Sequence, residues 1–480
     1  MANSASASVN PYTLYTSNPA DLSHPKWLKT ALSNPKKIWN SYNLVTERET
    51  YRATARAELL QYGTEGLDLE DGELLAYSTL DATMLDEERK IRRFSTEAYD
   101  RNRVIVGGDP NRFVNASYVR EGAGGRWWVA AEAPTSSGAH AFLSMFLPPE
   151  DPEDYLQGGE GALTSYSSSR SAPRPRIHTI IQLSPPREGS SRPPDPYFPS
   201  VLTSSWTIHA RSPSSAPLHS GASQNGAHGH TASPAPAPLR VQTVKQKRYT
   251  KANCTKTTFT ITRQNSIPTA SVRDLRTAAA SSASSEESYE VVHLLFESWP
   301  AKSIPNSDSH QALRELMTLA YRVNSRPPSQ YSANGTLLGV ESSQAAPFDP
   351  PMVITCAEGG RTGTFIAINS ILRSHKCIPS PYDSMHVAPR MPASPLGPQP
   401  TEIANDPVLK ELDHLLEQRM NMIDNETQVR FIYQMLWDGI TERAEAAQSM
   451  YTPLPLLSAS ALQQRPPVTK PKPKPRKGRL

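Results

Sequence analysis

The residues best suited to chemistry lie in one short stretch, 353–364. An apolar run ends at Cys356, two glycines follow, and Arg361 precedes a segment with the apolar spacing of a helix. Backbone N–H groups at a helix start bind an oxyanion, and an arginine holds it through two parallel hydrogen bonds. The same positive field favours the thiolate form of a cysteine, whose free pKa is about 8.5. The stretch therefore predicts a phosphate-binding loop with a cysteine nucleophile.

Apolar periodicity predicts the elements that position this loop. Strands and helices alternate, which indicates an α/β sheet protein, and in such sheets sites lie where strands end and helices begin. We expect strands over 113–119, 126–131, 177–183 and 289–296, and helices over 47–60, 85–94, 139–147, 313–320, 365–372 and 431–440.

Composition restricts both the fold and the surroundings of the protein. The chain has 480 residues, 45 prolines and a hydrophobic fraction of 37%, so long segments are expected to stay unpacked. A net charge of +4 gives no reason to expect nucleic-acid binding. Three cysteines are too few for a disulfide framework and fit a reducing compartment, the cytoplasm or alternatively the nucleus. We expect neither a signal peptide nor a membrane span, because no apolar run reaches about 18 residues.

Composition also predicts how the chain is divided. We expect an N-terminal extension over 1–45, one domain over 46–445, and a Pro/Lys-rich disordered tail over 446–480. The tail is either a plain solvated tail, a ligand for domains that bind proline motifs, an acidic-membrane contact or a nuclear-import signal. Within the domain, low-complexity inserts are predicted at about 184–240, 275–287, 324–350 and 377–404.

Several blocks resemble the protein-tyrosine-phosphatase family and follow that family's order. Residues 113–119 (FVNASYV) are similar to its YINASYI strand, and 295–300 (LFESWP) to its HFTAWPD loop. Weaker likenesses lie at 128–134 and 431–433, and the cysteine stretch resembles the signature loop. The resemblance implies one α/β domain with a twisted mixed β-sheet flanked by helices, and long disordered inserts.

The resemblance also implies roles for particular residues. Cys356 would be the nucleophile, Arg361 the phosphate clamp, and Thr362 would help to hold the thiolate. No metal and no cofactor are implied. The remaining implied residues would bind the phosphate (Ala357, Glu358, Gly359, Gly360 and Gly363) or recognise the substrate (Phe94, Trp299, Pro300 and Gln428).

The loop departs from the family in length. Four residues separate Cys356 from Arg361, whereas the family has five, and a missing residue removes about 3.5 Å of chain. Counted from the strand, Cys356 is the nucleophile in a cramped loop. Counted back from Arg361, that position falls on Thr355, and a hydroxyl without an adjacent base is a poor nucleophile. Cys356 is alternatively a buried structural thiol, and Glu358 adds a carboxylate to a loop meant for a dianion.

Two further positions lack the expected chemistry. The aspartate that follows Trp-Pro in the family is Ala301 here, with Asp308 as a distant substitute, so the general acid is missing. The water-positioning glutamine corresponds to Asp424.

Three functions follow from these observations. The first is a domain that recognises phosphotyrosine proteins, or another phosphate anion, with dephosphorylation impaired or absent, as in a pseudophosphatase. The second is an active protein-tyrosine phosphatase that forms a cysteinyl-phosphate. The third is a scaffold that binds no phosphate.

Overall fold

The computed structural model describes residues 23–63, 75–85, 96–109, 112–148, 176–183, 195–210, 236–264, 287–332, 337–340, 349–356, 359–379 and 393–451. Within these ranges ten strands form one sheet, in the order β1-β2-β10-β3-β7-β6-β5-β4, with β8 pairing with β7 and β9. The strands are β1 (Ala116–Arg120), β2 (Trp127–Glu132), β3 (Thr179–Gln182), β4 (Ser205–Ile208), β5 (Leu239–Tyr249), β6 (Cys254–Arg263), β7 (Glu287–Phe296), β8 (Ser329–Ser332), β9 (Leu337–Val340) and β10 (Met352–Cys356).

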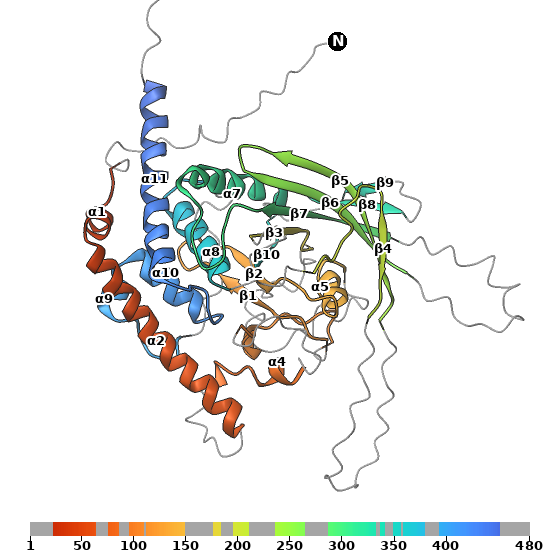
Figure 1. The fold of residues 1–480 in the computed structure, drawn as a ribbon, viewed down its shortest axis with the longest axis horizontal. Helices are drawn as coiled ribbons and strands as arrows, with labels where there is room; N and C mark the ends of the chain where they lie inside the picture. Colours follow the sequence, from red (N-terminus) through yellow and green to blue (C-terminus); the bar gives the residue numbers. More distant parts are fainter. Residues whose placement is uncertain are drawn as a thin grey trace, which may run out of the picture.

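The sheet is mixed. Strand β10 lies parallel between β2 and β3, and β3 is parallel to β7, whereas the other pairs are antiparallel. Figure 1 shows the twisted sheet with helices around it. The helices are α1 (Lys26–Ser33), α2 (Pro35–Tyr62), α4 (Leu80–Leu85), η3 (Asp100–Asn102), α5 (Ala139–Ser144), η5 (Ser307–Ser309), α7 (His310–Asn324), α8 (Gly359–Ser374), α9 (Thr401–Ala404), α10 (Pro407–Leu416) and α11 (Glu426–Tyr451). The predicted α/β class, with a twisted mixed sheet flanked by helices, is confirmed.

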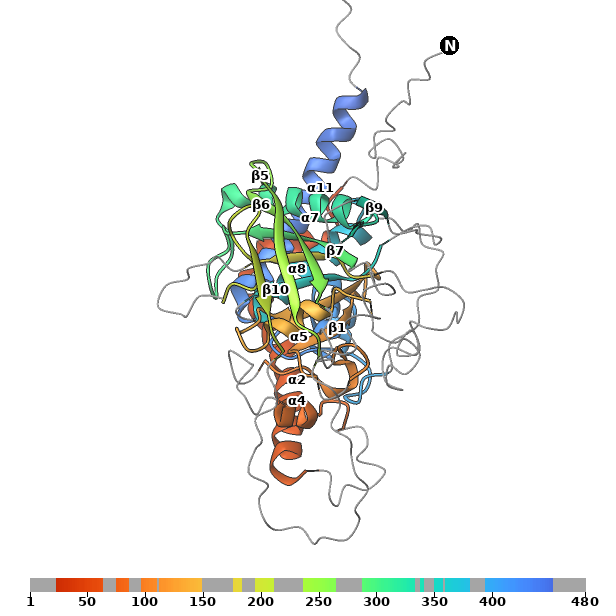
Figure 2. The ribbon, with the colours of Figure 1, turned by 90° about the vertical axis from the view of Figure 1, so that its right-hand side faces the viewer.

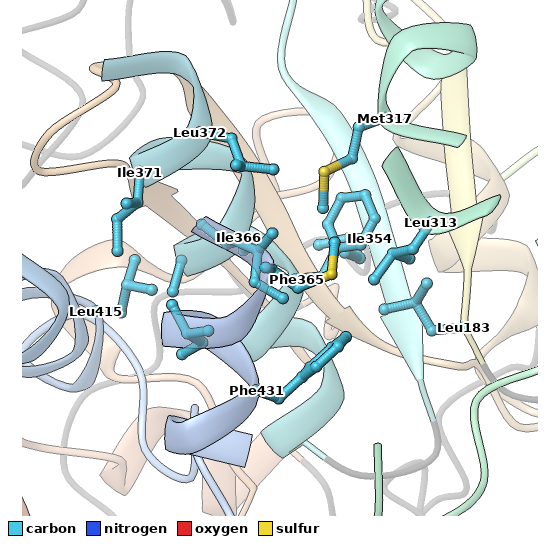
Figure 3. Packing of buried hydrophobic residues seen from close by; sticks show 14 of the residues in the cluster. Leu183, Leu313, Met317, Ile354, Phe365, Ile366, Ile371, Leu372, Leu415 and Phe431 are labelled. Carbon is cyan, nitrogen blue, oxygen red and sulfur yellow. The ribbon is translucent and has the colours of Figure 1, made fainter. Parts of the chain in front are cut away.

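Hydrophobic residues cover both faces of the sheet. Ile354 on β10 belongs to the larger core cluster, which also contains residues of α7, α8, α10 and α11. Its neighbour Val353 points to the other face and joins a second cluster with α5, because successive side chains of a strand alternate. Figure 3 shows Ile354 near Phe365 of α8, with Phe431 of α11 close by. Strand β10 is thus fixed from both sides, and so is the cysteine that ends it.

Two helices occupy the predicted N-terminal extension. Helix α1 lies wholly within 1–45, and α2 begins at Pro35 and continues past that boundary to Tyr62. The side chain of Asn34 accepts from Lys37 N at 3.3 Å, and Pro35 fits the first turn. Leu28 and Ile38 are fully buried in the larger cluster. The apolar spacing here is sparse, so the sequence predicted only 47–60 as helix.

Some ranges predicted as inserts contain regular structure. Strand β4 lies within 184–240 and pairs with β5, strands β8 and β9 lie within 324–350, and α9 lies within 377–404. Backbone pairing stabilises these short segments although their side chains carry little apolar periodicity. The remaining parts of the inserts, 184–194, 211–235, 275–286, 333–336, 341–348 and 380–392, lie outside the described residues.

The other predicted strands and the helix over 139–147 agree with the structure to within three residues, whereas the predicted helices over 365–372 and 431–440 are parts of the longer helices α8 and α11. The predicted helix over 85–94 lies outside the described residues except for Leu85. Helix α11 crosses the predicted boundary at 446 and ends at Tyr451, and the rest of the tail, 452–480, also lies outside them. Figure 2 shows α11 projecting from the body of the protein, so its last turns leave the core.

Candidate active site

The candidate site lies at the carboxyl ends of the parallel strands. Cys356, the last residue of β10, is level with Glu132, the last residue of β2. On the other side Thr355 pairs with Gln182, which ends β3 and pairs in turn with Leu295 near the end of β7. Helix α8 begins at Gly359, three residues after Cys356. Ligand sites of α/β sheets lie at this edge, as the sequence predicted.

Cys356 and Thr362 are brought together. The Cys356 side chain is buried, and its Sγ lies 3.0 Å from Oγ1 of Thr362 in the first turn of α8. Either atom can donate. If Cys356 is a thiolate, the Thr362 hydroxyl must be the donor, because a thiolate carries no proton. This contact is the one that the resemblance implied for the pair.

Arg361 joins the start of α8 to the loop after β7. Its side chain is fully buried, and Nη1 donates to Trp299 O at 2.8 Å. Trp299 is itself fully buried, its ring meets the edge of Phe431 on α11, and its Nε1 donates to Ser303 O at 2.9 Å. The tryptophan therefore acts as a packed support that fixes the carbonyl to which the guanidinium binds. Pro300 follows it and is exposed.

Glycines at the start of α8 allow a second loop to pack against the helix. A Cβ on Gly363 would lie 1.9 Å from Met422 O, and one on Gly359 would lie 2.4 Å from Asn421 O. No side chain fits at such distances, so any other residue would push the 421–424 loop away. The sequence assigned these glycines to phosphate binding, and the structure gives them this packing role.

Asp424 lies against the same helix start. A Cβ on Gly360 would lie 2.0 Å from Oδ2 of Asp424, so the carboxylate rests directly on the glycine. Gln428 fixes it: its Nε2 donates to Asp424 Oδ2 at 3.1 Å, and its Oε1 accepts from Asp424 N at 2.9 Å. Oε1 also accepts from Thr364 of α8 at 3.3 Å. The protein thus places its own negative charge where a helix N-terminus attracts anions.

A cavity of about 240 Å³ opens beside this loop. It lies between the 421–424 loop and α2, and Tyr42 of α2 donates from its hydroxyl to Asp424 O at 3.3 Å. Helix α2 is therefore part of the surroundings of the site, although the sequence placed its first part in an extension. The cavity is lined by Tyr42, Val45, Thr46, Glu49, Leu416, Asn421, Ile423 and Asp424.

Sequence reasoning missed Arg419, which is buried close to Cys356. Its guanidinium donates to Ser117 Oγ at 2.7 Å and to Asn115 Oδ1 at 2.9 Å. Burial lowers the pKa of Arg419 to about 10, while the negative charges of Glu132 and Cys356 act in the opposite direction. The attraction is mutual, so Arg419 favours a thiolate at Cys356. One signal was available in the sequence: residues 113–119 carry polar side chains, among them Asn115 and Ser117, that need a hydrogen-bond partner once they are buried.

The general acid expected of this chemistry has no evident replacement. Ala301 follows Trp299-Pro300, is partly exposed and cannot donate a proton. Asp308 lies in η5 at the start of α7 and is exposed. Among the residues that the structure describes, no contact joins Asp308 to Cys356 or Arg361. Ala357, Glu358 and Phe94, which the sequence assigned to the site, lie outside the described ranges.

Comparison with known proteins found one family model that matches part of the chain and several similar structures. Residues 239–392 match the model of the family described as "Protein-tyrosine phosphatase". Its structure is similar to that of the Trypanosoma cruzi protein tyrosine phosphatase TcPTP1, with 15% identity and a TM-score of 0.44 over 85% of this chain and 96% of that one. It is also similar to PTPN18 in complex with HER2-pY1248 phosphopeptides, with 15% identity and a TM-score of 0.43 over 84% of this chain and 99% of that one. No curated protein matches the sequence.

No group of three or more His, Cys, Asp or Glu side chains in the ranges that the structure describes is arranged to hold a metal ion. None of the helices there is both long enough and apolar enough to cross a membrane.

Proposed function

We propose that this chain recognises phosphotyrosine proteins, or another phosphate anion, through its cysteine and arginine loop, and that its dephosphorylation activity is impaired or absent. The observation that carries the proposal is the contact of Arg361 with the loop that begins at Trp299. Arg361 is buried next to Thr362, the partner of the Cys356 thiol, and donates to Trp299 O at 2.8 Å. Two residues after Trp299, the loop carries Ala301 instead of an acid. These two observations support binding of an anion by Arg361 and the lack of a proton donor at position 301.

The consequences for the reaction follow from the chemistry. Attack of a thiolate on the phosphorus expels the tyrosine phenolate, a step that general acid catalysis accelerates by typically ~10²–10⁴-fold. Ala301 supplies none of this. A guanidinium and helix amides still stabilise a bound phosphate, because neither interaction needs a proton donor. Binding without efficient turnover is therefore the expected behaviour.

The negative charge of Asp424 is expected to weaken phosphate binding. Its carboxylate rests on Gly360 at the start of α8. Two like unit charges about 4 Å apart repel by roughly 4 kcal/mol at an effective dielectric of about 20. A phosphate must therefore displace this side chain or share the site with it at a cost in affinity. We expect weak binding in the unmodified protein.

One observation favours the active phosphatase as a second candidate. The 3.0 Å separation between Cys356 Sγ and Thr362 Oγ1 is suitable for a hydroxyl that donates to a thiolate. Arg419 adds positive charge nearby. A nucleophile prepared in this way retains some reactivity even without a general acid.

Calorimetry with a phosphotyrosine peptide tests recognition. The full chain should bind the phosphorylated peptide more tightly than its unphosphorylated form, and Arg361→Lys should lose most of that difference, because lysine keeps the charge but not the two-pronged geometry. Arg430→Ala, which removes a cation from the surface of α11, is the matched control and should leave the difference intact. Equal binding of both peptides by the unmodified chain would favour the scaffold function.

Release of phosphate from an aryl phosphate tests turnover. We expect little or no release above a Cys356→Ser variant. Fast release that disappears in Cys356→Ser would show an active enzyme and would overturn the proposed impairment. Circular dichroism of each variant shows whether the fold is retained.

A further inference from the structure

A cluster of cations lies on the hairpin formed by β5 and β6, outside the candidate active site. Lys245 and Lys247 alternate with Gln246 along β5, so both point to the same face. Lys256 on β6 is the direct cross-strand neighbour of Lys247. Arg326, just after the end of α7, is the fourth member. We call Lys245, Lys247, Lys256 and Arg326 the hairpin cation surface.

The face of the sheet that carries this surface is fixed by the core. Tyr249 follows Lys247 on the same face of β5 and pairs with Cys254. Cys254 is buried in the larger core cluster together with residues of α7, and Tyr249 packs against that cluster. The cation surface therefore lies on the α7 side, where Figure 1 shows the hairpin extending beside α7.

Among the residues that the structure describes, most charges that act on Lys256 are positive. Lys245, Lys247 and Arg326 are exposed, and Lys256 is partly buried. The charges acting on Lys256 come from these three cations and one anion, Glu290. By contrast, Arg248 on the opposite face of β5 forms an ion pair with Glu297 at 3.6 Å.

The pairing of Lys247 with Lys256 has an energetic cost. Side chains directly opposite each other on antiparallel strands lie about 4.5–5.5 Å apart, and like charges at such positions destabilise the sheet. An anionic ligand that lies across both strands would remove the repulsion, because it would pair with both cations together.

We propose that the hairpin cation surface binds an acidic segment of a partner polypeptide. The surface lies along two strands, and an extended peptide has the same repeat of about 3.3 Å per residue, so alternate acidic side chains match Lys245 and Lys247. The aromatic ring of Tyr249 lies 5.0 Å from Lys247 Nζ and offers an apolar contact next to the charges. The small size of the surface and the chain's net charge of only +4 favour a peptide over nucleic acid.

The surface also lies within reach of the candidate active site. Cys254 pairs with Phe296, three residues before Trp299, and Lys256 is two residues beyond Cys254. Five residues of extended chain span about 17 Å. On the proposed function, a phosphotyrosine protein with acidic residues about five or more positions from the phosphotyrosine would contact both sites.

An unphosphorylated peptide tests the surface by itself. Fluorescence anisotropy would measure binding of a ten-residue Glu-rich peptide to the full chain at low salt. The double variant Lys245→Glu/Lys247→Glu should bind about tenfold more weakly, because two favourable contacts become two repulsive ones. The control Lys29→Glu/Lys36→Glu changes exposed lysines on α1 and α2 by the same net charge and should bind like the unmodified chain.

The outcomes separate this proposal from the proposed function. Equal loss of binding in both double variants, or no binding of the Glu-rich peptide, would overturn the proposal that the hairpin cation surface binds an acidic segment. So would binding of anionic phosphatidylserine vesicles or of a DNA oligonucleotide that exceeds binding of the peptide. Because the probe has no phosphate, the result does not depend on Arg361. A loss of peptide binding in the hairpin variant alone supports the proposed role of the surface, even if the protein does not bind a phosphotyrosine peptide.

Discussion

At the scale of single residues, the candidate site is defined by two side-chain contacts and by two positions that differ from the expected sequence. Cys356 Sγ lies 3.0 Å from the Thr362 hydroxyl, and the Arg361 guanidinium donates to Trp299 O. On the proposed function, Ala301 lacks the proton that a general acid would donate, and Asp424 adds a negative charge beside the bound phosphate. Each of these two departures is a single substitution, so each is tested separately.

Replacing Asp424 by asparagine should strengthen phosphate binding. The change removes the negative charge that rests on Gly360 and keeps an amide that can bond with Gln428. Relief of even a third of the roughly 4 kcal/mol repulsion corresponds to about tenfold in affinity. Calorimetry with a phosphotyrosine peptide measures it, and Glu426→Gln, two residues away and partly exposed, is the matched control. Equal affinities of Asp424→Asn and the unmodified chain would show that the carboxylate does not oppose the ligand.

Replacing Ala301 by aspartate should restore a general acid. If the cysteine loop still binds phosphate in line with Sγ, release from an aryl phosphate should rise by about 10²-fold or more, and activity should fall at high pH as the new acid loses its proton. Ala301→Asn has the same shape without the proton and serves as control. Similar rates for the two variants would place the defect in the short loop instead.

At the scale of elements, two segments far apart in sequence define the site. Loop 421–424 packs against the first turn of α8 because Gly359, Gly360 and Gly363 leave room for it. The loop after β7 reaches the same turn through Arg361. The stability of the site therefore depends on these contacts between elements.

Changing Gly363 to alanine should destabilise the protein and the site together. The new Cβ would lie 1.9 Å from Met422 O, so the 421–424 loop must move. Overpacking of this kind costs typically about 1–3 kcal/mol of unfolding free energy, measured by urea denaturation. Gly138→Ala is the control, since a Cβ there comes no closer than 3.4 Å to Thr135 Oγ1 and φ is −86°. A loss of stability in Gly363→Ala no larger than in this control would contradict the packing argument.

The elements that the sequence predicted well were those with strong periodicity or a motif. Strand β10 and helix α8 follow from a buried apolar run followed by glycines and Arg361. Helix α1 and strand β4 were not predicted, because α1 is only eight residues long and β4 is stabilised by pairing with β5. Arg419 was missed because its role depends on Asn115 and Ser117, about 300 residues earlier in the chain. The polar side chains of Asn115 and Ser117 indicate a need for a buried partner, but nothing near them in the sequence identifies Arg419 as that partner.

At the scale of the whole molecule, buried titratable groups give the fold a dependence on pH. Burial lowers the pKa of His293 to about 3 and that of His178 to about 4. Burial, reinforced by the charge of Glu121, raises the pKa of Glu411 to about 7. The histidines lower the unfolding free energy in acid, because in the unfolded chain they take up protons near pH 6.5, whereas in the folded chain they stay neutral until a lower pH. Glu411 acts in the opposite direction, because the folded chain keeps a proton that the unfolded chain loses near pH 4.5.

The histidine effect predicts acid sensitivity that one substitution should weaken. Between about pH 6 and pH 4 each buried neutral histidine lowers the unfolding free energy by up to ~1.4 kcal/mol per pH unit, whereas Glu411 offsets only part of this. His293 lies beside Tyr197 and Phe198, and its Nε2 is 3.0 Å from Gln182 Oε1. His293→Gln, which cannot take up the proton, should flatten the slope by about one proton in urea titrations at several pH values. His209→Gln, at an exposed position, should leave it unchanged. An unaltered slope in His293→Gln would mean that His293 is protonated equally in the folded and unfolded chains, and that acid sensitivity arises elsewhere.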